Sequence, residues 1–273
     1  MNTIYHFSGA GNDFVVIDGR EGDVSQYREV SRIEALCKEH KTDGLMILGL
    51  DGGSTGSPTV MADPDRPFVD FTMEFYNPDG SGGMMCGNGG RCIVAFADYL
   101  GIRPASGDVF LFRAPDGLHT GEILARPEEG LWEVRIKMID VQGITPMLGG
   151  YFLNTGTRHF VKFVDDVEQV DIDTEGRALR WNEAFAPVGT NVNFVHIAPD
   201  GLHVRTFEKG VEGETLACGT GLTASAIAAY HIGKPETRLR ARQDWLSVNF
   251  TPGADEKFTD VYLTGPTRLV EIL

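Results

Sequence analysis

The chain has few cysteines, fewer basic than acidic residues, and no long hydrophobic run. Four cysteines in 273 residues are too few for a disulfide scaffold of this size, and no Cys-x-x-Cys zinc spacing occurs. The 24 basic residues are outnumbered by 39 acidic ones, which argues against nucleic acid or an anionic membrane as the main partner. No segment approaches the roughly 18 apolar residues of a membrane span, and residues 1–18 lack the regions of a signal peptide. We therefore expect a cytoplasmic protein with reduced thiols.

Glycine, in contrast, is abundant. The chain has 34 glycines among 273 residues, or about 12%, where about 7% is usual. They follow no Gly-X-Y period and are densest in the segment 77–90, NPDGSGGMMCGNGG. Such clusters indicate particular backbone sites where a side chain would interfere.

The hydrophobic pattern predicts strands that alternate with helices. A helix is expected over about 25–41, with Ser25 as its N-cap, and residues 51–67 read as a long loop. Two further helices are almost wholly apolar, which predicts burial on most sides, and each ends at a glycine, Gly101 or Gly233. These two helices are expected over 91–100 and about 222–232, and strands over 14–17, 45–50, 68–76, 160–164, 193–197 and 203–207.

The two buried helices belong to an internal repeat with an offset of 132 residues (218 − 86). Without a gap, this offset superimposes a strand residue, the motif Cys-Gly-x-Gly and the helix stop: Phe75 on Phe207, Cys86 on Cys218, Gly87 on Gly219, Gly89 on Gly221, and Gly101 on Gly233. Two such motifs, each before a buried helix, indicate a duplicated unit. We therefore predict two similar α/β halves, each with one cysteine at a helix N-terminus.

A cysteine at a helix N-terminus is suited to acid–base chemistry. The positive end of the helix dipole stabilises a thiolate, and the nearby backbone N–H groups can bind a carboxylate. Two such cysteines beside one carboxylate can invert the neighbouring carbon, because one removes a proton and the other delivers one to the opposite face. The alternatives are two core thiols or a structural disulfide, but core packing does not require Cys-Gly-x-Gly at two helix starts.

Four segments resemble diaminopimelate epimerases, in order along nearly the whole chain: GAGNDFVVID, FYNPDGSGGMMCGNGGRC, TNVNFVHI and FEKGVEGETLACGTG. The resemblance implies an isomerase of lysine and peptidoglycan precursor synthesis that interconverts LL- and meso-diaminopimelate without pyridoxal phosphate, another cofactor or a metal. It also implies an α/β fold with mixed sheets and two pseudo-symmetric halves, each of strands wrapped around a central helix, with the site in the cleft between them. The halves would be residues 1–118 with a returning strand at 263–273, and residues 119–262. Members are commonly homodimers.

The resemblance also implies roles for individual residues. Cys86 and Cys218 match the two acid–base residues, His159 matches a histidine that tunes the pKa of a cysteine, and Glu208 matches an acidic residue near the substrate ammonium that shares this role. Further positions match substrate contacts: Asn12, Asn77, Gly87, Asn88, Thr157, Asn191, Lys209, Gly219 and Thr220. Asn12, Asn77 and Asn191 could instead be turn or cap residues, and His159 a hydrogen-bonded core residue.

Three departures from the family pattern fall mostly at the substrate-recognition end. Thr157-Arg158 replaces Asn-Pro, Lys209 replaces an arginine, and Gly44 replaces a glutamine. Lysine keeps the positive charge but lacks the two-pronged geometry of the guanidinium. The nearest rival interpretation is a two-thiol racemase of proline, hydroxyproline or another amino acid, although such enzymes typically carry histidine where this chain has Asn88. A non-catalytic thiol protein with a redox or binding role is the rival from another class.

Overall fold

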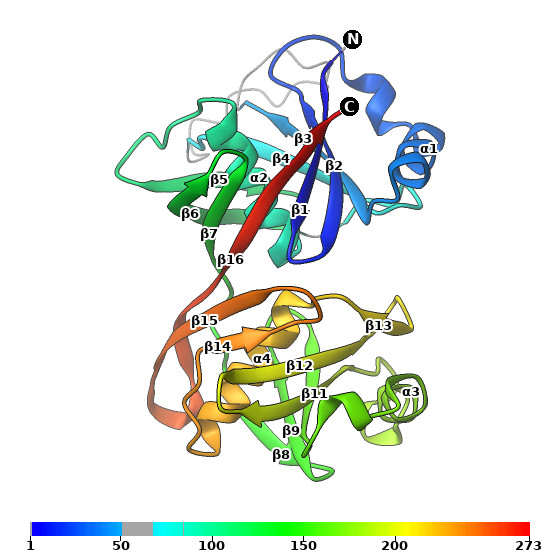
Figure 1. Cartoon of the computed structure of the whole chain (residues 1–273), viewed down its shortest axis with the longest axis vertical. Coiled ribbons are helices and arrows are strands. Elements are labelled where there is room, and N and C mark those ends of the chain that lie inside the picture. Colours follow the sequence, from blue (N-terminus) through cyan, green and yellow to red (C-terminus); the bar gives the residue numbers. More distant parts are fainter. Residues whose placement is uncertain (1, 51–67, 84) are drawn as a thin grey trace. The chain divides into compact units, whose positions relative to one another are not determined.

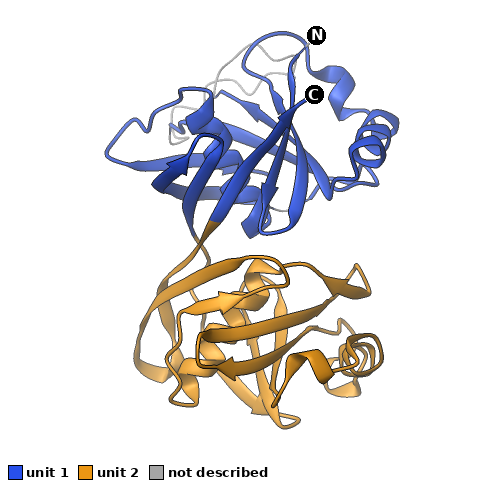
Figure 2. Cartoon of the chain, in the orientation of Figure 1, with its two compact units in different colours: residues 1–136, 266–273 blue, residues 137–265 orange. Residues whose placement is uncertain are grey.

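The computed structural model describes residues 2–50, 68–83 and 85–273. The loop expected at 51–67 lies outside these ranges. The chain divides into two compact units (Figure 2): unit 1 comprises residues 1–136 and 266–273, and unit 2 comprises residues 137–265. The boundary therefore falls later than the predicted 118, because the strands after residue 118 pair with the preceding strand of unit 1.

In unit 1 the strands form a closed ring in which neighbours in sequence are paired. The last strand, β16 (Phe258–Ile272), pairs with both β7 (Leu131–Lys137) and β1 (Ile4–Gly9) (Figure 1). The elements are β1 (Ile4–Gly9), β2 (Asn12–Asp18), the 3-10 helix η1 (Ser25–Arg28), α1 (Val30–His40), β3 (Gly44–Gly49), β4 (Phe71–Tyr76), α2 (Gly87–Tyr99), β5 (Val109–Ala114), β6 (Gly117–Glu128), β7 (Leu131–Lys137) and the end of β16 (Phe258–Ile272).

Unit 2 has a similar succession of paired strands. Its elements are β8 (Ile144–Met147), β9 (Gly150–Asn154), β10 (Arg158–Phe163), the short helices η2 (Val167–Gln169), η3 (Ile172–Gly176), α3 (Arg177–Arg180) and η4 (Glu183–Phe185), β11 (Asn191–Ala198), β12 (Gly201–Glu208), β13 (Gly213–Thr215), α4 (Gly219–His231), β14 (Arg238–Arg240), β15 (Trp245–Pro252), η5 (Ala254–Glu256) and the start of β16.

The pairing directions confirm the predicted duplication. From β1 to β7 the successive pairs are antiparallel, parallel, antiparallel, parallel, antiparallel and antiparallel. The series β9, β10, β11, β12, β14, β15 and β16 shows the same order of directions. In both units the helix that begins at the cysteine lies in sequence between the two strands of the second parallel pair, β4 and β5 or β12 and β14. The two halves therefore place their cysteines at equivalent points.

The two central helices are buried as predicted. Every residue of α2 from Gly87 to Asp98 is buried, and so is the α4 stretch from Gly221 to Ala229. Both end at a glycine with positive φ, Gly101 (78°) and Gly233 (74°), and the next N–H returns to the last turn. This arrangement is a Schellman C-cap, which favours glycine because it lacks a Cβ.

Both central helices begin earlier than predicted, at Gly87 rather than 91 and at Gly219 rather than 222. Glycine is a poor helix former, so the apolar pattern alone does not show this first turn. Burial of the turn overrides the low helix propensity. As a result, Cys86 and Cys218 are the N-cap residues themselves.

The prediction of one helix over 25–41 was wrong at its start. Residues Ser25–Arg28 form a separate 3-10 helix, and the N-cap of α1 is Glu29, whose side chain makes no capping hydrogen bond. Val30 is 52% exposed, whereas Ile33 and Leu36 of the same helix are buried. These two side chains pack on the outer face of β2 and β3.

The gapless offset of the repeat also fails in one strand. Phe75 faces α2, where its ring lies near the site of a Cβ on Gly89, whereas Phe207 packs in the cluster on the outer face of unit 2 with Ile172 and Phe185. The equivalent of Phe207 is therefore Tyr76, which packs on the outer cluster of unit 1. A longer connection with the added strand β13 leads from β12 to α4 and shifts the strand relative to the helix.

Candidate active site

Cys86 lies at the N-cap of α2, as the sequence predicts. Its sulfur accepts a hydrogen bond from the N–H of Gly89 at 3.2 Å, and its side chain is exposed. A Cβ on Gly89 would lie 3.2 Å from this sulfur, so the glycine lets the sulfur approach the backbone. The N–H groups of a first helical turn have no intrahelical acceptor, and they favour a negative charge at Cys86.

Asn12 and Asn88 lie side by side beside this helix start. The Asn88 amide nitrogen donates to the Asn12 oxygen at 2.5 Å, and the Asn12 nitrogen donates to a carboxylate oxygen of Asp43 at 3.2 Å. The same Asp43 oxygen accepts from the N–H of Asp13 at 2.9 Å. Because a carboxylate only accepts, Asp43 determines which way both amides point. No local sequence pattern predicts a role for Asp43, which directly precedes β3.

The Gly44 departure has a structural reason in this chain. A Cβ at position 44 would lie 2.8 Å from the carbonyl oxygen of Tyr76 and 3.2 Å from the ring of Phe75. Any larger residue would have to displace β4. Glycine at position 44 therefore allows β3 and β4 to lie close together.

Asn77 follows β4 in a tight turn. Its nitrogen donates to the Ser81 hydroxyl at 3.0 Å, and its backbone N–H donates to the Ser81 carbonyl at 2.9 Å. Within the described ranges, these hydrogen bonds stay inside the turn 77–81 and do not join Asn77 to Asn12 or Asn88. The alternative that Asn77 organises a turn thus has direct support, and a substrate contact by Asn77 stays a prediction.

Cys218 lies at the N-cap of α4 and is 7% exposed. Its sulfur is 3.5 Å from the Thr220 hydroxyl, which in turn is 2.9 Å from Nε2 of His159. His159 is fully buried, and burial lowers its pKa to about 3. Unit 2 therefore brings together three of the predicted residues in the order His159, Thr220 and Cys218, and His159 reaches the sulfur through Thr220.

A second group of predicted residues surrounds Asn191, the first residue of β11. Its amide nitrogen donates to the Arg158 carbonyl at 2.9 Å and to the Thr157 hydroxyl at 3.3 Å, and its oxygen accepts from the N–H of Lys209 at 2.8 Å. Glu208, at the end of β12, accepts from the Thr215 hydroxyl at 2.8 Å. Asn191 is 3% exposed and fixes where Thr157 and Lys209 lie.

The turn that carries Thr157-Arg158 is held without the proline of the family pattern. The Arg158 guanidinium donates to the Phe185 carbonyl at 3.2 Å and lies 5.2 Å from the centre of the Phe152 ring. The Thr155 hydroxyl, for which no motif predicts a role, donates to the Thr220 carbonyl at 2.9 Å. The Thr155 contact ties the turn to α4, and the Arg158 contacts tie it to η4 and β9, so other contacts hold this turn where the family pattern has a proline.

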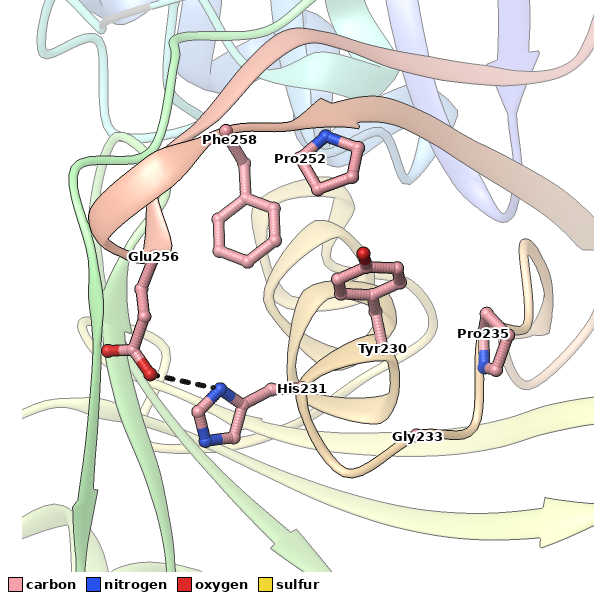
Figure 3. Close-up of a pocket in the computed structure, with 8 residues that line it drawn as sticks. Tyr230, His231, Gly233, Pro235, Pro252, Glu256 and Phe258 are labelled. Carbon is pink, nitrogen blue, oxygen red and sulfur yellow. Dashed lines mark ion pairs between the residues drawn. The ribbon is translucent and has the colours of Figure 1, made fainter.

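An open hollow of about 510 Å³ lies at the opposite end of α4 (Figure 3). It is lined by Tyr230, Phe258 and the ion pair of His231 with Glu256 at 3.3 Å. With a rise of 1.5 Å per residue, this end is about 18 Å along the helix from its start, so the hollow is separate from the cysteine. Among the described residues no three His, Cys, Asp or Glu side chains are grouped to hold a metal ion. None of the helices in the same ranges is long and apolar enough to cross a membrane.

The remaining two cysteines are unsuited to acid–base work. Cys92 is fully buried inside α2 and Cys37 is 3% exposed in the cluster of α1. Burial raises the pKa of both thiols, so they stay protonated. Cys86 and Cys218 are the cysteines that combine a helix N-terminus with polar neighbours.

Known proteins resemble this chain along nearly its whole length. The family model described as "Diaminopimelate epimerase" matches residues 151–269. The diaminopimelate epimerase of Chlorobaculum tepidum is 38% identical over 272 residues, which cover 96% of this chain and 97% of that protein.

Two solved structures share the fold. A phenazine biosynthesis protein of the PhzF family from Bacillus anthracis has a TM-score of 0.69 at 10% identity and covers 100% of this chain and 98% of its own. A probable proline racemase from Agrobacterium radiobacter K84 has a TM-score of 0.64 at 14% identity, with coverage of 100% and 92%. Such low identities show the fold alone, whereas the full-length relative at 38% identity shows that the chain belongs to the diaminopimelate epimerase family.

Proposed function

We propose that this protein interconverts LL- and meso-2,6-diaminopimelate by a cofactor-independent two-base mechanism, in lysine and peptidoglycan precursor synthesis. The observation that carries the proposal is the pair of N-cap cysteines, one per unit, at equivalent points of a duplicated fold. Family membership supports the substrate, and the helix starts support the chemistry.

Each cysteine would serve one face of the α-carbon. The thiolate on one side takes the α-proton, the electron pair of the broken C–H bond moves toward the carboxylate, and the thiol on the other side delivers its proton to the carbon. The α-proton is weakly acidic, so the developing negative charge must be stabilised. Backbone N–H groups at Gly87, Asn88, Gly219 and Thr220 are suited to this, because they are oriented before the reaction begins.

The other predicted residues would recognise the substrate beyond the reacting carbon. Lys209 supplies a positive charge for the distal carboxylate, Asn191 holds Lys209 in place, and Glu208 supplies a negative charge for an ammonium group. Thr157 and Asn77 would add polar contacts. We also propose a cytoplasmic location and a homodimer, as in the family.

Solvent deuterium tests this function. The purified protein, kept reduced, is incubated in deuterated water with LL-diaminopimelate, meso-diaminopimelate, L-proline and trans-4-hydroxy-L-proline in separate reactions. We expect deuterium at the α-carbon of both diaminopimelate isomers, together with their interconversion. Exchange on proline or hydroxyproline alone would support the rival racemase, and no exchange on any substrate, with thiols that respond to oxidant, would support the non-catalytic thiol protein.

Removal of the Asp43 carboxylate should weaken substrate binding. In Asp43→Ala, Asn12 and Asn88 lose the acceptor that orients them, so we expect KM to rise about three- to tenfold, as for one lost hydrogen bond of about 0.7 to 1.4 kcal/mol. Steady-state kinetics measure this effect. Asp23→Ala, which removes another exposed carboxylate that accepts from a backbone N–H in unit 1, is the matched control and should leave KM unchanged. An unchanged KM in Asp43→Ala would contradict the positioning role.

A further inference from the structure

A buried polar cluster lies on the inner face of the unit 2 strands, toward α4. His159, Asn193 and Thr206 come from β10, β11 and β12, and they are 0%, 0% and 4% exposed. Asn193 lies directly opposite Thr206 in the sheet, and His159 lies opposite Asn191. Burial of polar groups costs free energy unless every group finds a partner, so such a cluster needs a reason.

The duplicated fold does not require these polar groups. In unit 1, Phe14 lies opposite Gly44 and Met46 lies opposite Phe75, in the same register as their counterparts in unit 2. The cluster of unit 2 thus corresponds to Phe14, Met46 and Phe75, which are all buried and apolar. The same strands pack around the same kind of helix with an apolar set, so the polar set serves a task that is specific to unit 2.

The hydrogen bonds determine where each proton lies. The Asn193 oxygen accepts from the Thr206 hydroxyl at 2.9 Å, and its nitrogen donates to the Phe160 carbonyl at 3.2 Å. A carbonyl cannot donate, so the Asn193 nitrogen must face it. The same nitrogen is 3.0 Å from Nδ1 of His159. Nδ1 therefore accepts, and the single proton of the neutral ring lies on Nε2.

The position of this proton decides what the Thr220 hydroxyl can do. Nε2–H donates to the Thr220 oxygen at 2.9 Å, which leaves the hydroxyl proton of Thr220 available to the Cys218 sulfur at 3.5 Å. With the ring proton on Nδ1 instead, Nε2 would accept a hydrogen bond from the Thr220 hydroxyl. That hydroxyl could then not donate to the Cys218 sulfur. We propose that Asn193, anchored by Thr206, holds the ring proton of His159 on Nε2 and thereby reserves the Thr220 hydroxyl as a donor to the Cys218 thiolate.

Asn193 and Thr206 are positioning residues in this account, and the inference rests on the proposed acid–base role of Cys218. Burial keeps His159 neutral, since its pKa is lowered to about 3. His159 therefore acts on Cys218 through the position of its proton rather than through a positive charge. An aspartate at position 193 would reverse this arrangement, because a carboxylate next to Nδ1 holds the ring proton there, as in serine protease triads.

The experiment measures two quantities separately and without substrate: the position of the His159 ring proton and the pKa of the Cys218 thiol. Nitrogen-15 NMR of histidine-labelled protein near pH 8 reports which ring nitrogen of His159 carries the proton. The pH dependence of alkylation, followed by mass spectrometry of the Cys218 peptide, gives the pKa of that thiol. Both are measured in wild type, in Asn193→Asp, in Thr220→Val, in the double variant and in Thr220→Ser. Ser225→Ala is the matched control, because this buried α4 hydroxyl bonds to its own helix.

We expect the proton on Nε2 in wild type and on Nδ1 in Asn193→Asp, with the Cys218 pKa raised by about one to two pH units. At pH values below the wild-type pKa of this thiol, the thiolate fraction then falls about ten- to a hundredfold. Thr220→Val should raise the pKa similarly, the double variant should raise it no further, and Thr220→Ser and Ser225→Ala should resemble wild type.

A wild-type proton on Nδ1, an unchanged Cys218 pKa in Asn193→Asp, or a further rise in the double variant would each overturn the inference. The wild-type NMR result needs no variant, so poor folding of a variant cannot hide a failure. A Cys218→Ser variant with wild-type epimerisation would instead refute the proposed function, and it would leave the proton positions unaffected.

Discussion

Cys86→Ser and Cys218→Ser are each expected to lower the rate of epimerisation by about 10²- to 10⁴-fold, the usual contribution of one general acid or base. A serine hydroxyl holds its proton much more tightly than a thiol, so serine cannot supply a comparable base at neutral pH. Each variant keeps the N-cap position filled by a residue that favours it, so α2 and α4 should still form. Circular dichroism and thermal unfolding check that the variants fold.

The two variants should also differ from each other in a way that only a two-base mechanism predicts. The remaining thiolate can still take a proton from the isomer whose α-proton faces it, although it cannot complete the inversion efficiently. Residual deuterium exchange should therefore survive with one isomer in Cys86→Ser and with the opposite isomer in Cys218→Ser. The same isomer preference in both variants would contradict the assignment of one cysteine to each face.

Cys37→Ala is the matched control for the loss of a thiol. Cys37 is 3% exposed in the outer cluster of unit 1, and burial raises its pKa, so it has no thiolate to lose. We expect kcat and KM to stay at wild-type values. A loss of activity comparable to that of the Cys86 variant would mean that disturbed packing, rather than acid–base chemistry, explains the effects.

Local patterns predicted the duplicated fold well. The Cys-Gly-x-Gly motifs, the apolar helices and the glycine stops at Gly101 and Gly233 are short-range signals, and the structure confirms them. The first helical turns were missed because glycine is a poor helix former in isolation. The strand register was misplaced by one residue because it depends on pairing between strands that are distant in the sequence. No local pattern shows that Phe75 corresponds to Thr206 rather than to Phe207.

In the candidate site, too, short-range motifs were predictive and hydrogen bonds between distant residues were not. Motifs placed Cys86 and Cys218 at helix starts, and the structure puts them there. Asp43 and Asn193 act through hydrogen bonds to residues 31 and 34 positions away, so the sequence gives no short-range sign of them. Asn193 could have been selected only by comparing the two halves in the correct register, where an asparagine replaces Met46.

Gly221→Ala should disrupt unit 2 at the point where fold and chemistry meet. A Cβ on Gly221 would lie 2.3 Å from the Asn193 oxygen, a distance that real Cβ contacts do not show. Asn193 cannot turn away without breaking its hydrogen bonds to Thr206, Phe160 and His159, so either this cluster or the first turn of α4 must move. We expect a loss of about 1 to 3 kcal/mol in the free energy of unfolding, typical of overpacking, and at least a tenfold lower kcat.

Gly89→Ala tests the physical reason for this expectation, because Gly89 holds the same position in α2. Its added Cβ would meet the sulfur of Cys86 at 3.2 Å and that of Met46 at 3.4 Å, and Met46 ends in a flexible thioether that can give way. Urea unfolding should therefore show a loss below about 1 kcal/mol for Gly89→Ala, since alanine also has the better helix propensity. If the two variants lose equal stability, the hydrogen-bonded Asn193 is not the reason why position 221 needs glycine. Crowding at the first helical turn would then explain both losses. If only Gly221→Ala loses stability, the polar cluster of unit 2 is as rigid as its hydrogen bonds indicate.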